Sequence, residues 1–515
     1  MVLQTVAAVV VVTSWESAPS TAADACFAWR LFRKPGGLSG LLRRIPGWLR
    51  TSLLWIGIRC SLMPPSLREW LPEGHLAWCV LDAVAEMDLA AFYARYREDG
   101  WGRPAYEPAM MVALVLYSYA RGERSSRGIE RRCVEDVAYR VIASNLAPDH
   151  VTINRFRSEH QGALAGLFGE VLRLCARAGM VRVGTVAVDE TRMAANASKE
   201  QTVDYEQLAR KILEEAAEID AAEDELYGDQ RGDELPEQLR TGAGRQAWLR
   251  EAKRQLEAER AANPKPVPRA RAPRLREAKR RLEEELWAEQ RANAAYEAWR
   301  MTAKDTLGRG LGKPPTPYTS PQVPAGTVNL TDPDSRIVQS SRGFMQGYTA
   351  QAVATKEQIV ITADVIAGGN ERQTLEPLLD KAHQELARAG VTDTVGSAVA
   401  DAGFWNSDQI ATLTERGIRT LVSPDAGSRK TPGLTRQRRK HYLEMREQLA
   451  TDAGKALYRQ RQAIIEPVFA QTKHNRRIDR FQRRGLWACR AEWRLITATH
   501  NLMKLWQQNP AIATG

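Results

Sequence analysis

Short apolar segments alternate with helical segments over the second part of the chain, and this alternation constrains the fold more than any other feature. Strands are predicted at residues 184–188, 348–354, 359–365, 397–400 and 419–423. Helices are predicted at residues 373–389 and 407–415, and from Glu466 to about Trp506 with Gly485 as a candidate break. This order of elements predicts a mixed α/β sheet covered by helices.

A helical region is predicted upstream of the first strand, over residues 63–178. Pro108 begins one helix, Ser125 caps the next, and Asp149 caps a short helix after a break at residues 145–148. Two short helices with a tight break suit a helix-turn-helix whose second helix contacts DNA. The polar side chains of that second helix are Thr152, Asn154, Arg155 and Arg157. Plain packing of two helices gives the same pattern, so both interpretations stay open.

The segment 199–324 interrupts the strand pattern. It contains long, charged, Ala-rich stretches that are broken between Pro264 and Pro273, and it ends in a Gly/Pro-rich linker at residues 308–324. We expect two antiparallel helices that form a hairpin, without a catalytic role. The predicted core then comprises residues 179–198 and 325–507, and residues 508–515 form a tail.

Residues 1–62 show no sustained hydrophobic period, and we expect a disordered or spurious extension there. Met63 is a candidate for the true start. The apolar stretch at residues 2–13 is short and lacks a preceding basic residue, so neither a signal peptide nor a membrane span is expected.

Positive charge is concentrated near the C-terminus. The chain of 515 residues has a net charge of +11, and residues 429–494 contain 18 Lys and Arg against 6 Asp and Glu. The local excess of 12 accounts for the whole net charge and favours a polyanionic partner such as DNA or RNA. A membrane surface is the weaker alternative, and a solvated basic face is the structural one.

The six cysteines are scattered without a C-x-x-C pair, and the seven histidines show no metal-ligand spacing. This pattern argues against a zinc site or a disulfide framework and fits a reducing cytoplasm.

Three carboxylates are candidates for a metal site. Asp189 and Asp401 each follow a predicted strand, where strand ends open onto a cleft, and Glu466 precedes Pro467 at the expected start of a helix. Carboxylates that converge repel one another unless a cation neutralises them, and magnesium prefers oxygen ligands. Two ions in such a site support phosphoryl transfer. Each acid by itself is equally well explained as a helix cap or a turn residue.

Basic residues follow Glu466 on the predicted last helix. Lys473 lies two turns on, and Arg477 and Arg480 fall close to the same face, which suits a phosphate backbone beside a metal site. A solvated basic helix is the alternative. We expect replacement of several arginines in this segment to flatten the salt dependence of DNA binding. The candidates for that test are Arg476, Arg477, Arg480, Arg483 and Arg484.

The chain resembles bacterial insertion-sequence transposases of the Asp-Asp-Glu (DDE) type with an InsH-like N-terminal domain and a long helical insertion. The resemblance covers about residues 66–505. It is carried by stretches at residues 103–108, 148–156, 187–191, 196–198, 331–336, 347–351, 400–405 and 466–469.

The resemblance implies an RNase H-like catalytic core with Asp189, Asp401 and Glu466 as ligands of two Mg²⁺ ions, Mn²⁺ being the substitute. It implies cleavage at terminal inverted repeats, attack of the freed 3′-hydroxyl on target DNA, a homodimer on DNA and a bacterial, nucleoid-associated location. The family signature places Tyr458 and Arg461 at DNA phosphates, although Arg461 lies one residue too far from Glu466.

Glu190 stands where the family has a small residue; it faces away from the metals or perturbs them. Two other functions stay open. One is an inactive DNA-binding relic or repressor, and the other is a simple RNase H-type nuclease, against which the helical region and the insertion argue.

Overall fold

The computed structural model describes residues 66–96, 105–212, 271–302, 326–340, 343–368, 373–424 and 436–508, with a few residues between 252 and 270. Two compact units are distinguished, Met1–Glu69 and Trp70–Gly515. The described residues of the first unit form a 3-10 turn, Leu67–Glu69. The expected extension at 1–62, the linker at 308–324 and the chain after Gln508 lie outside the described residues.

Helices make up every regular element described between Trp70 and Arg177. They are α5 (Leu76–Ala85), α6 (Ala90–Tyr93), α7 (Pro108–Ala120), α8 (Ser126–Glu135), α9 (Val137–Ile142), α10 (His150–Glu159) and α11 (Gln161–Arg177). The predicted helix starts are confirmed. Pro108 is the first residue of α7, Ser125 Oγ accepts from Gly128 N at 3.3 Å, and Asp149 Oδ1 accepts from Thr152 N at 2.8 Å.

A mixed six-stranded sheet follows. Its strands are β1 (Thr185–Ala194), β4 (Arg336–Ser340), β5 (Gly343–Thr355), β6 (Val360–Ile366), β7 (Ser397–Ala400) and β8 (Arg419–Val422). The order is β4-β5-β1-β7-β8, and β6 also pairs with β5. β5 is antiparallel to β1, β4 and β6, whereas β7 is parallel to both β1 and β8. The mixed sheet and all five predicted strands are confirmed, and β4 was not predicted.

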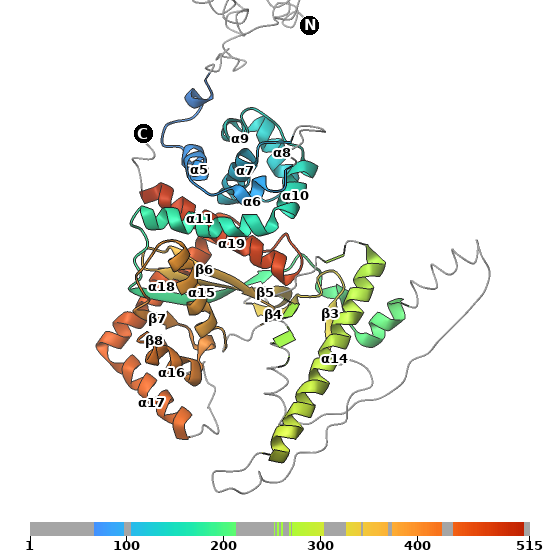
Figure 1. The fold of residues 1–515 in the computed structure, drawn as a ribbon, viewed down its shortest axis with the longest axis vertical. Helices are drawn as coiled ribbons and strands as arrows, with labels where there is room; N and C mark the ends of the chain where they lie inside the picture. The colour runs from blue at the N-terminus through green and yellow to red at the C-terminus, as the bar shows by residue number, and fades with distance from the viewer. Residues whose placement is uncertain are drawn as a thin grey trace, which may run out of the picture. The chain divides into compact units, whose positions relative to one another are not determined.

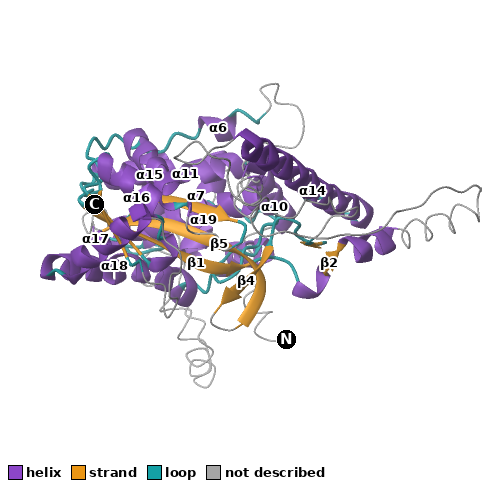
Figure 2. Ribbon diagram, turned by 90° about the horizontal axis from the view of Figure 1, so that it is seen from below, coloured by secondary structure: helices purple, strands orange, loops and turns teal. Residues whose placement is uncertain are grey.

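The first strand is longer than the sequence suggested. It was expected to end at Asp189, but β1 continues to Ala194 because β5 pairs with it from Val186 as far as Ala194, which lies opposite Gly347. Figure 2 shows these two long strands side by side. Gly347 permits the close approach, since a Cβ there would lie 2.5 Å from Met193 O. Polar residues 190–192 hid this half of the strand from the hydrophobic pattern.

The helices after the β5–β6 hairpin are α15 (Leu375–Arg388), α16 (Ser407–Glu415), α17 (Arg436–Ala450), α18 (Asp452–Ala470) and α19 (Leu486–Gln508). The predictions at 373–389 and 407–415 are confirmed. The predicted start of the last helix at Glu466 is wrong, because α18 begins at Asp452, passes into a π turn at Gln471–Asn475 and stops before α19. The candidate break at Gly485 is confirmed, since Gly485 has a φ of 87° and α19 runs from Leu486 past Trp506. Arg477 has a positive φ of 55° just after this stop.

Pro467 is therefore inside α18 and does not begin it. Thr451 caps the helix instead, since its Oγ1 accepts from Gly454 N at 3.0 Å. Pro467 has no N–H to donate to the carbonyl four residues earlier, that of Ala463. The side chain of Gln358 fills this gap, with Nε2 donating to Ala463 O at 3.1 Å. A contact from the β5–β6 turn thus allows the proline within the helix.

The insertion contains a long helix, α14 (Arg271–Thr302), as expected. Helical residues between 252 and 260 contact α14 through Arg260, and the predicted partner helix over residues 213–215 lies outside the described residues. The insertion is not purely helical, because β2 (Thr202–Asp204) pairs with β3 (Thr327–Asn329) at its base, after a 3-10 turn at Lys199–Gln201. β2, β3 and α14 enclose a small second hydrophobic core.

One continuous hydrophobic core joins the N-terminal helices, the sheet and the C-terminal helices. α11 and α19 pack side by side between the other N-terminal helices and the sheet (Figure 1). α18 packs against β1, β5 and β7. The sheet is therefore held between helices from both ends of the chain.

Candidate active site

Two of the three predicted carboxylates lie on neighbouring parallel strands. Val188 of β1 is in register with Ala400 of β7, so Asp189 and Asp401 are the next residues on adjacent strands. Asp401 ends its strand and caps the 3-10 turn Ala402–Phe404, and its Oδ1 accepts from Gly403 N at 3.0 Å. Asp189 is within β1 but lies beyond the pairing with β7. Both carboxylates are thus at the edge where parallel strands end.

Glu466 reaches the same region from α18, which packs across β1 and β7. Its side chain is exposed, whereas the neighbouring Ile464 and Ile465 are buried. The pKa of Asp189 is raised in part by the charges of Asp401 and Glu466. The fold therefore brings Asp401 and Glu466 close enough to Asp189 for their charges to act on its pKa.

Burial is the main cause of an unusual pKa at Asp189, which is raised from its ordinary value of 3.8 to about 6. A hydrogen bond from Glu190 N and the positive charge of Arg461 act in the opposite direction. Arg461 Nη1 lies 2.5 Å from Asp189 Oδ2. One arginine does not offset the burial and the two neighbouring acids, so the site still favours additional positive charge.

The oxygen donors suit a hard divalent cation. Among the described residues, however, no three His, Cys, Asp or Glu side chains lie close enough together to hold a single metal ion. Asp189 is held by Arg461. The residue types fit a metal, and Arg461 offsets only part of the negative charge of the three acids. The side-chain positions are those of a site in which Arg461 is the cation that contacts Asp189.

Arg461 contacts the first carboxylate, a partner that sequence reasoning missed. Five residues separate Arg461 from Glu466, which turns the two side chains about 140° apart on a helix. Arg461 is mostly buried against Asp189, and Glu466 is exposed. The spacing between Arg461 and Glu466, one residue longer than in the transposases that the chain resembles, was the sequence signal that the two side chains do not point the same way.

Glu190 is paired away from the carboxylate edge. Successive residues of a strand point to opposite faces, so Glu190 and Arg192 share the face that Asp189 does not occupy. Glu190 forms an ion pair with Arg192, whose Nη1 also donates to Thr349 Oγ1 at 2.6 Å. This arrangement agrees with the interpretation in which Glu190 faces away from the three acids.

Tyr458 is on α18, and Lys473 is in the π turn that follows this helix. Lys473 Nζ donates to Arg192 O at 2.7 Å, which ties the π turn to β1. Tyr458 is half-buried near Arg461, and burial raises the pKa of its hydroxyl. Tyr458 thus neighbours the carboxylates, whereas Lys473 contacts β1 three residues beyond Asp189.

Arg477 and Arg480 are exposed, but they do not share a helix face with Lys473, because the helix has ended before them. The expected single stripe of cations is therefore wrong. Arg476 is buried, and its guanidinium donates to Ile496 O at 3.1 Å and to Thr499 Oγ1 at 2.8 Å. Burial lowers its pKa to about 9. Arg476 is an internal residue and leaves the set of candidate DNA contacts.

The second helix of the candidate helix-turn-helix is α10. Asn154 and Arg155 are exposed on it, while Thr152 Oγ1 donates to Asp149 Oδ2 at 3.0 Å within the cap. Arg157 is only 4% exposed and donates to Arg124 O at 2.6 Å. Of the four predicted side chains, two are therefore available on the surface, and Arg157 is used inside the protein.

The four cysteines in the described part of the chain are Cys79, Cys133, Cys175 and Cys489, and all of them are buried and free. Within the same part, no helix is both long and apolar enough to cross a membrane.

Two segments match known protein families. Residues 65–159 match a transposase domain (DUF772), and residues 425–506 match a transposase DDE domain. The first match covers α5–α10, and the second includes α18 with Arg461 and Glu466. Asp189 and Asp401 lie outside both matches. Searches of the curated proteins and of the solved structures gave no significant match.

Proposed function

We propose that this chain, supported as an insertion-sequence DDE transposase by its two family matches, cleaves DNA at the terminal inverted repeats of its element. It then joins the freed 3′-hydroxyl ends to target DNA. The observation that carries the proposal is the approach of Asp401 and Glu466 to Asp189, seen in the strand register and in the raised pKa of Asp189. The proposed site thus takes its carboxylates from three separate elements, β1, the end of β7 and α18.

The proposed catalytic core is RNase H-like and comprises residues 179–198 and 325–507. It is supported by the mixed sheet, in which β7 and β8 run parallel to β1 and β5 runs antiparallel. The remaining proposed divisions are an N-terminal region at 1–62, a helical DNA-binding domain at 63–178, an insertion with its linker at 199–324 and a tail at 508–515.

Asp189, Asp401 and Glu466 would hold two divalent ions, Mg²⁺ or in its place Mn²⁺. When bound, such ions activate the attacking oxygen and stabilise the leaving oxygen of a phosphoryl transfer. Asp189 must leave Arg461 to become a ligand, and the freed guanidinium is then available to a DNA phosphate. Asp401 keeps its orientation through the hydrogen bond from Gly403 N.

DNA contacts are proposed on two surfaces. Asn154 and Arg155 are the exposed polar residues of α10, with Thr152 beside them, and Arg477 and Arg480 are exposed after the π turn. Tyr458, Arg461 and Lys473 are the proposed phosphate contacts beside the acids. Transposition holds two DNA ends together, so the active form is proposed to be a homodimer on DNA, located on the bacterial nucleoid.

The test uses the full chain, Mg²⁺ and a labelled duplex that carries the element's own terminal repeat. Asp189→Asn, Asp401→Asn and Glu466→Gln should each reduce cleavage by several orders of magnitude while binding to the repeat is retained. Asp452→Asn is the matched control, because Asp452 is a fully exposed acid in the first turn of α18. It should cleave like the wild type.

Equal cleavage by all the variants would overturn the proposed mechanism. Binding to the repeat without any cleavage by the wild type, at any divalent metal concentration, would favour the inactive DNA-binding relic or repressor. Cleavage of DNA regardless of the repeat would favour a simple nuclease.

A further inference from the structure

A cavity of about 1010 Å³ lies between the insertion and the loop that leads into α19. Its walls come from the junction of α10 and α11, from Asn196 after β1, from α14 and from residues 482–488. Eight arginines line it against four acidic residues, Glu159, Glu259, Glu284 and Asp334. The cavity therefore has a local excess of positive charge, shared between the basic segment before α19 and the insertion, for which the sequence predicted no catalytic role.

Several of these arginines are already neutralised. Arg260, Arg280 and Arg281 form ion pairs with acids on α14 or with Asp334. Arg291 and Arg484 differ, since within the described residues neither has a carboxylate at ion-pair distance, and both are exposed. Arg484 Nε donates to a backbone oxygen, that of Asn196, at 3.0 Å. The excess charge is thus available to an anionic ligand.

Two tryptophans line the same cavity from different elements. Trp287 on α14 is 58% exposed, and Trp487 at the start of α19 is 38% exposed. Large aromatic side chains are usually covered in a folded protein, and exposed ones beside cations mark binding surfaces. Arginines supply partners for phosphates and tryptophans supply surfaces for stacked bases.

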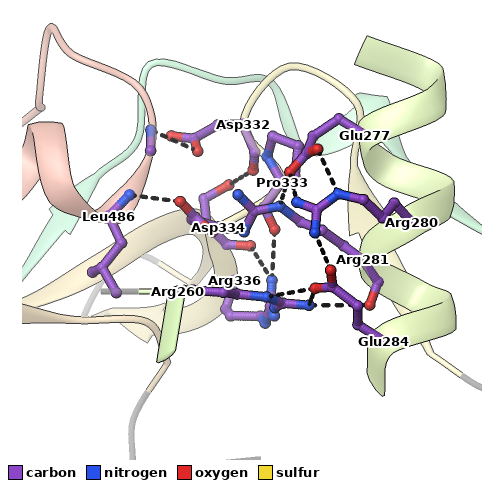
Figure 3. Close-up of polar contacts among 12 residues, drawn as sticks. Arg260, Glu277, Arg280, Arg281, Glu284, Asp332, Pro333, Asp334, Arg336 and Leu486 are labelled. Carbon is purple, nitrogen blue, oxygen red and sulfur yellow. Dashed lines mark hydrogen bonds and ion pairs between the residues drawn. The ribbon is translucent and has the colours of Figure 1, made fainter. Parts of the chain in front are cut away.

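The cavity is fixed by the loop between β3 and β4. Asp334 Oδ2 accepts from Leu486 N at 2.8 Å, and the same carboxylate forms an ion pair with Arg281 of α14 (Figure 3). Asp332 is fully buried and accepts from Tyr348 Oη at 2.7 Å and from Gly485 N at 3.0 Å. One short loop therefore holds both the insertion wall and the α19 wall, so that the site is preorganised.

We propose that this cavity binds a single-stranded segment of DNA, with phosphates on Arg291 and Arg484 and unpaired bases on Trp287 and Trp487. A duplex is disfavoured because its base faces are already stacked and cannot reach the tryptophans. An acidic peptide would use the arginines but would leave two exposed tryptophans without a matching ring. The inference rests on the proposed function only in naming DNA as the polyanion.

The cavity can act together with the carboxylate edge, because β1 connects them. Seven residues separate Asp189 from Asn196 at the rim, which spans at most about 23 Å of extended chain. At the roughly 3.4 Å per nucleotide of a stacked strand, about seven nucleotides cover this distance, and an unstacked single strand needs fewer. A strand opened near the acids would therefore reach the cavity.

The test measures fluorescence anisotropy of the full chain with a labelled oligothymidylate and, separately, with a duplex of unrelated sequence. Trp287→Ala and Trp487→Ala should each weaken single-strand binding by about 5- to 100-fold and leave duplex binding unchanged. Arg291→Gln and Arg484→Gln should weaken it and flatten its salt dependence. Trp299→Ala is the matched control, because Trp299 is a 46% exposed tryptophan on α14 outside the cavity lining.

A second measurement is independent of affinity. A single strand with 5-bromodeoxyuridine should photocrosslink to peptides that contain Trp287 or Trp487. Unchanged single-strand affinity in all four variants, crosslinks elsewhere, or equal losses for single strand and duplex would each overturn the inference. Competition against the labelled oligonucleotide gives a third readout. Unlabelled oligonucleotide should displace it better than an acidic peptide does, and the reverse order would contradict the inference. These outcomes are separate from cleavage by the carboxylate variants, so either proposal can fail alone.

Discussion

Arg461 Nη1 lies 2.5 Å from Oδ2 of Asp189, yet the pKa of this carboxyl is still raised to about 6. The ion pair is enclosed, with the two side chains 16% and 14% exposed. Burial and the neighbouring acids outweigh the attraction of one arginine. In its ionised form, Asp189 thus destabilises the folded protein when no cation other than Arg461 is present.

Asp189→Asn should stabilise the metal-free protein at neutral pH. Because the folded state binds this proton more tightly than the unfolded state, the contribution of Asp189 to stability is fully present below about pH 4 and is lost as the pH rises through about 6. A shift of about two units corresponds to at most about 3 kcal/mol. Thermal unfolding with a chelator should show a higher Tm for Asp189→Asn near pH 7.5 and no difference near pH 4. A lower Tm at both pH values would contradict this explanation.

Arg157→Ala and Arg155→Ala should have different effects, although both residues are on α10. Arg157 is buried and donates to Arg124 O and to Gln482 Oε1, so its loss leaves a cavity and an unsatisfied carbonyl. We expect a loss of about 3 kcal/mol in the free energy of unfolding. Arg155 is exposed, and its replacement should weaken DNA binding with little change in stability. Urea unfolding and repeat-DNA binding distinguish the two, and equal effects on binding at full stability would restore Arg157 to the DNA surface.

Gln358→Ala should destabilise α18 without direct contact with the acids. Its side chain satisfies the Ala463 carbonyl that Pro467 leaves without a donor, and it also accepts from Lys504 Nζ at 2.6 Å. The expected loss is about 1–3 kcal/mol in the free energy of unfolding. Gln462→Ala, an exposed replacement on the same helix, is the control and should change stability by less than about 0.5 kcal/mol. In the double variant Gln358→Ala/Pro467→Ala, the restored N–H should recover part of the loss.

The basic segment after α18 should separate into surface and internal arginines. Arg477→Ala/Arg480→Ala should lower the salt dependence of binding to repeat DNA by up to about two units of slope, about 0.9 for each phosphate contact. Arg476→Ala should leave the slope unchanged and should reduce stability, because its guanidinium is buried among Ile496, Thr499 and Thr472. An unchanged slope in the double variant would remove this surface from the DNA interface.

Local sequence signals predicted many of the elements. Pro108, Ser125 and Asp149 mark helix starts because a cap or a proline acts within one turn. The core strands were found from short apolar runs, since a buried strand needs such runs whatever covers it. Where long-range contacts decide, prediction failed. β5 extends β1 beyond Asp189, and Gln358 permits Pro467 inside α18.

The sequence by itself determined the mixed α/β order and singled out the three candidate acids, because both depend on residue type and on neighbours close along the chain. Tertiary structure alone decided which arginine side chains contact which partners. It placed Arg461 on Asp189, buried Arg157 and Arg476, and left Arg484 exposed beside Trp487. A long arginine side chain reaches several surroundings from one backbone position, so packing from distant segments sets its role. The variants of these arginines therefore test what the tertiary structure adds to the three acids.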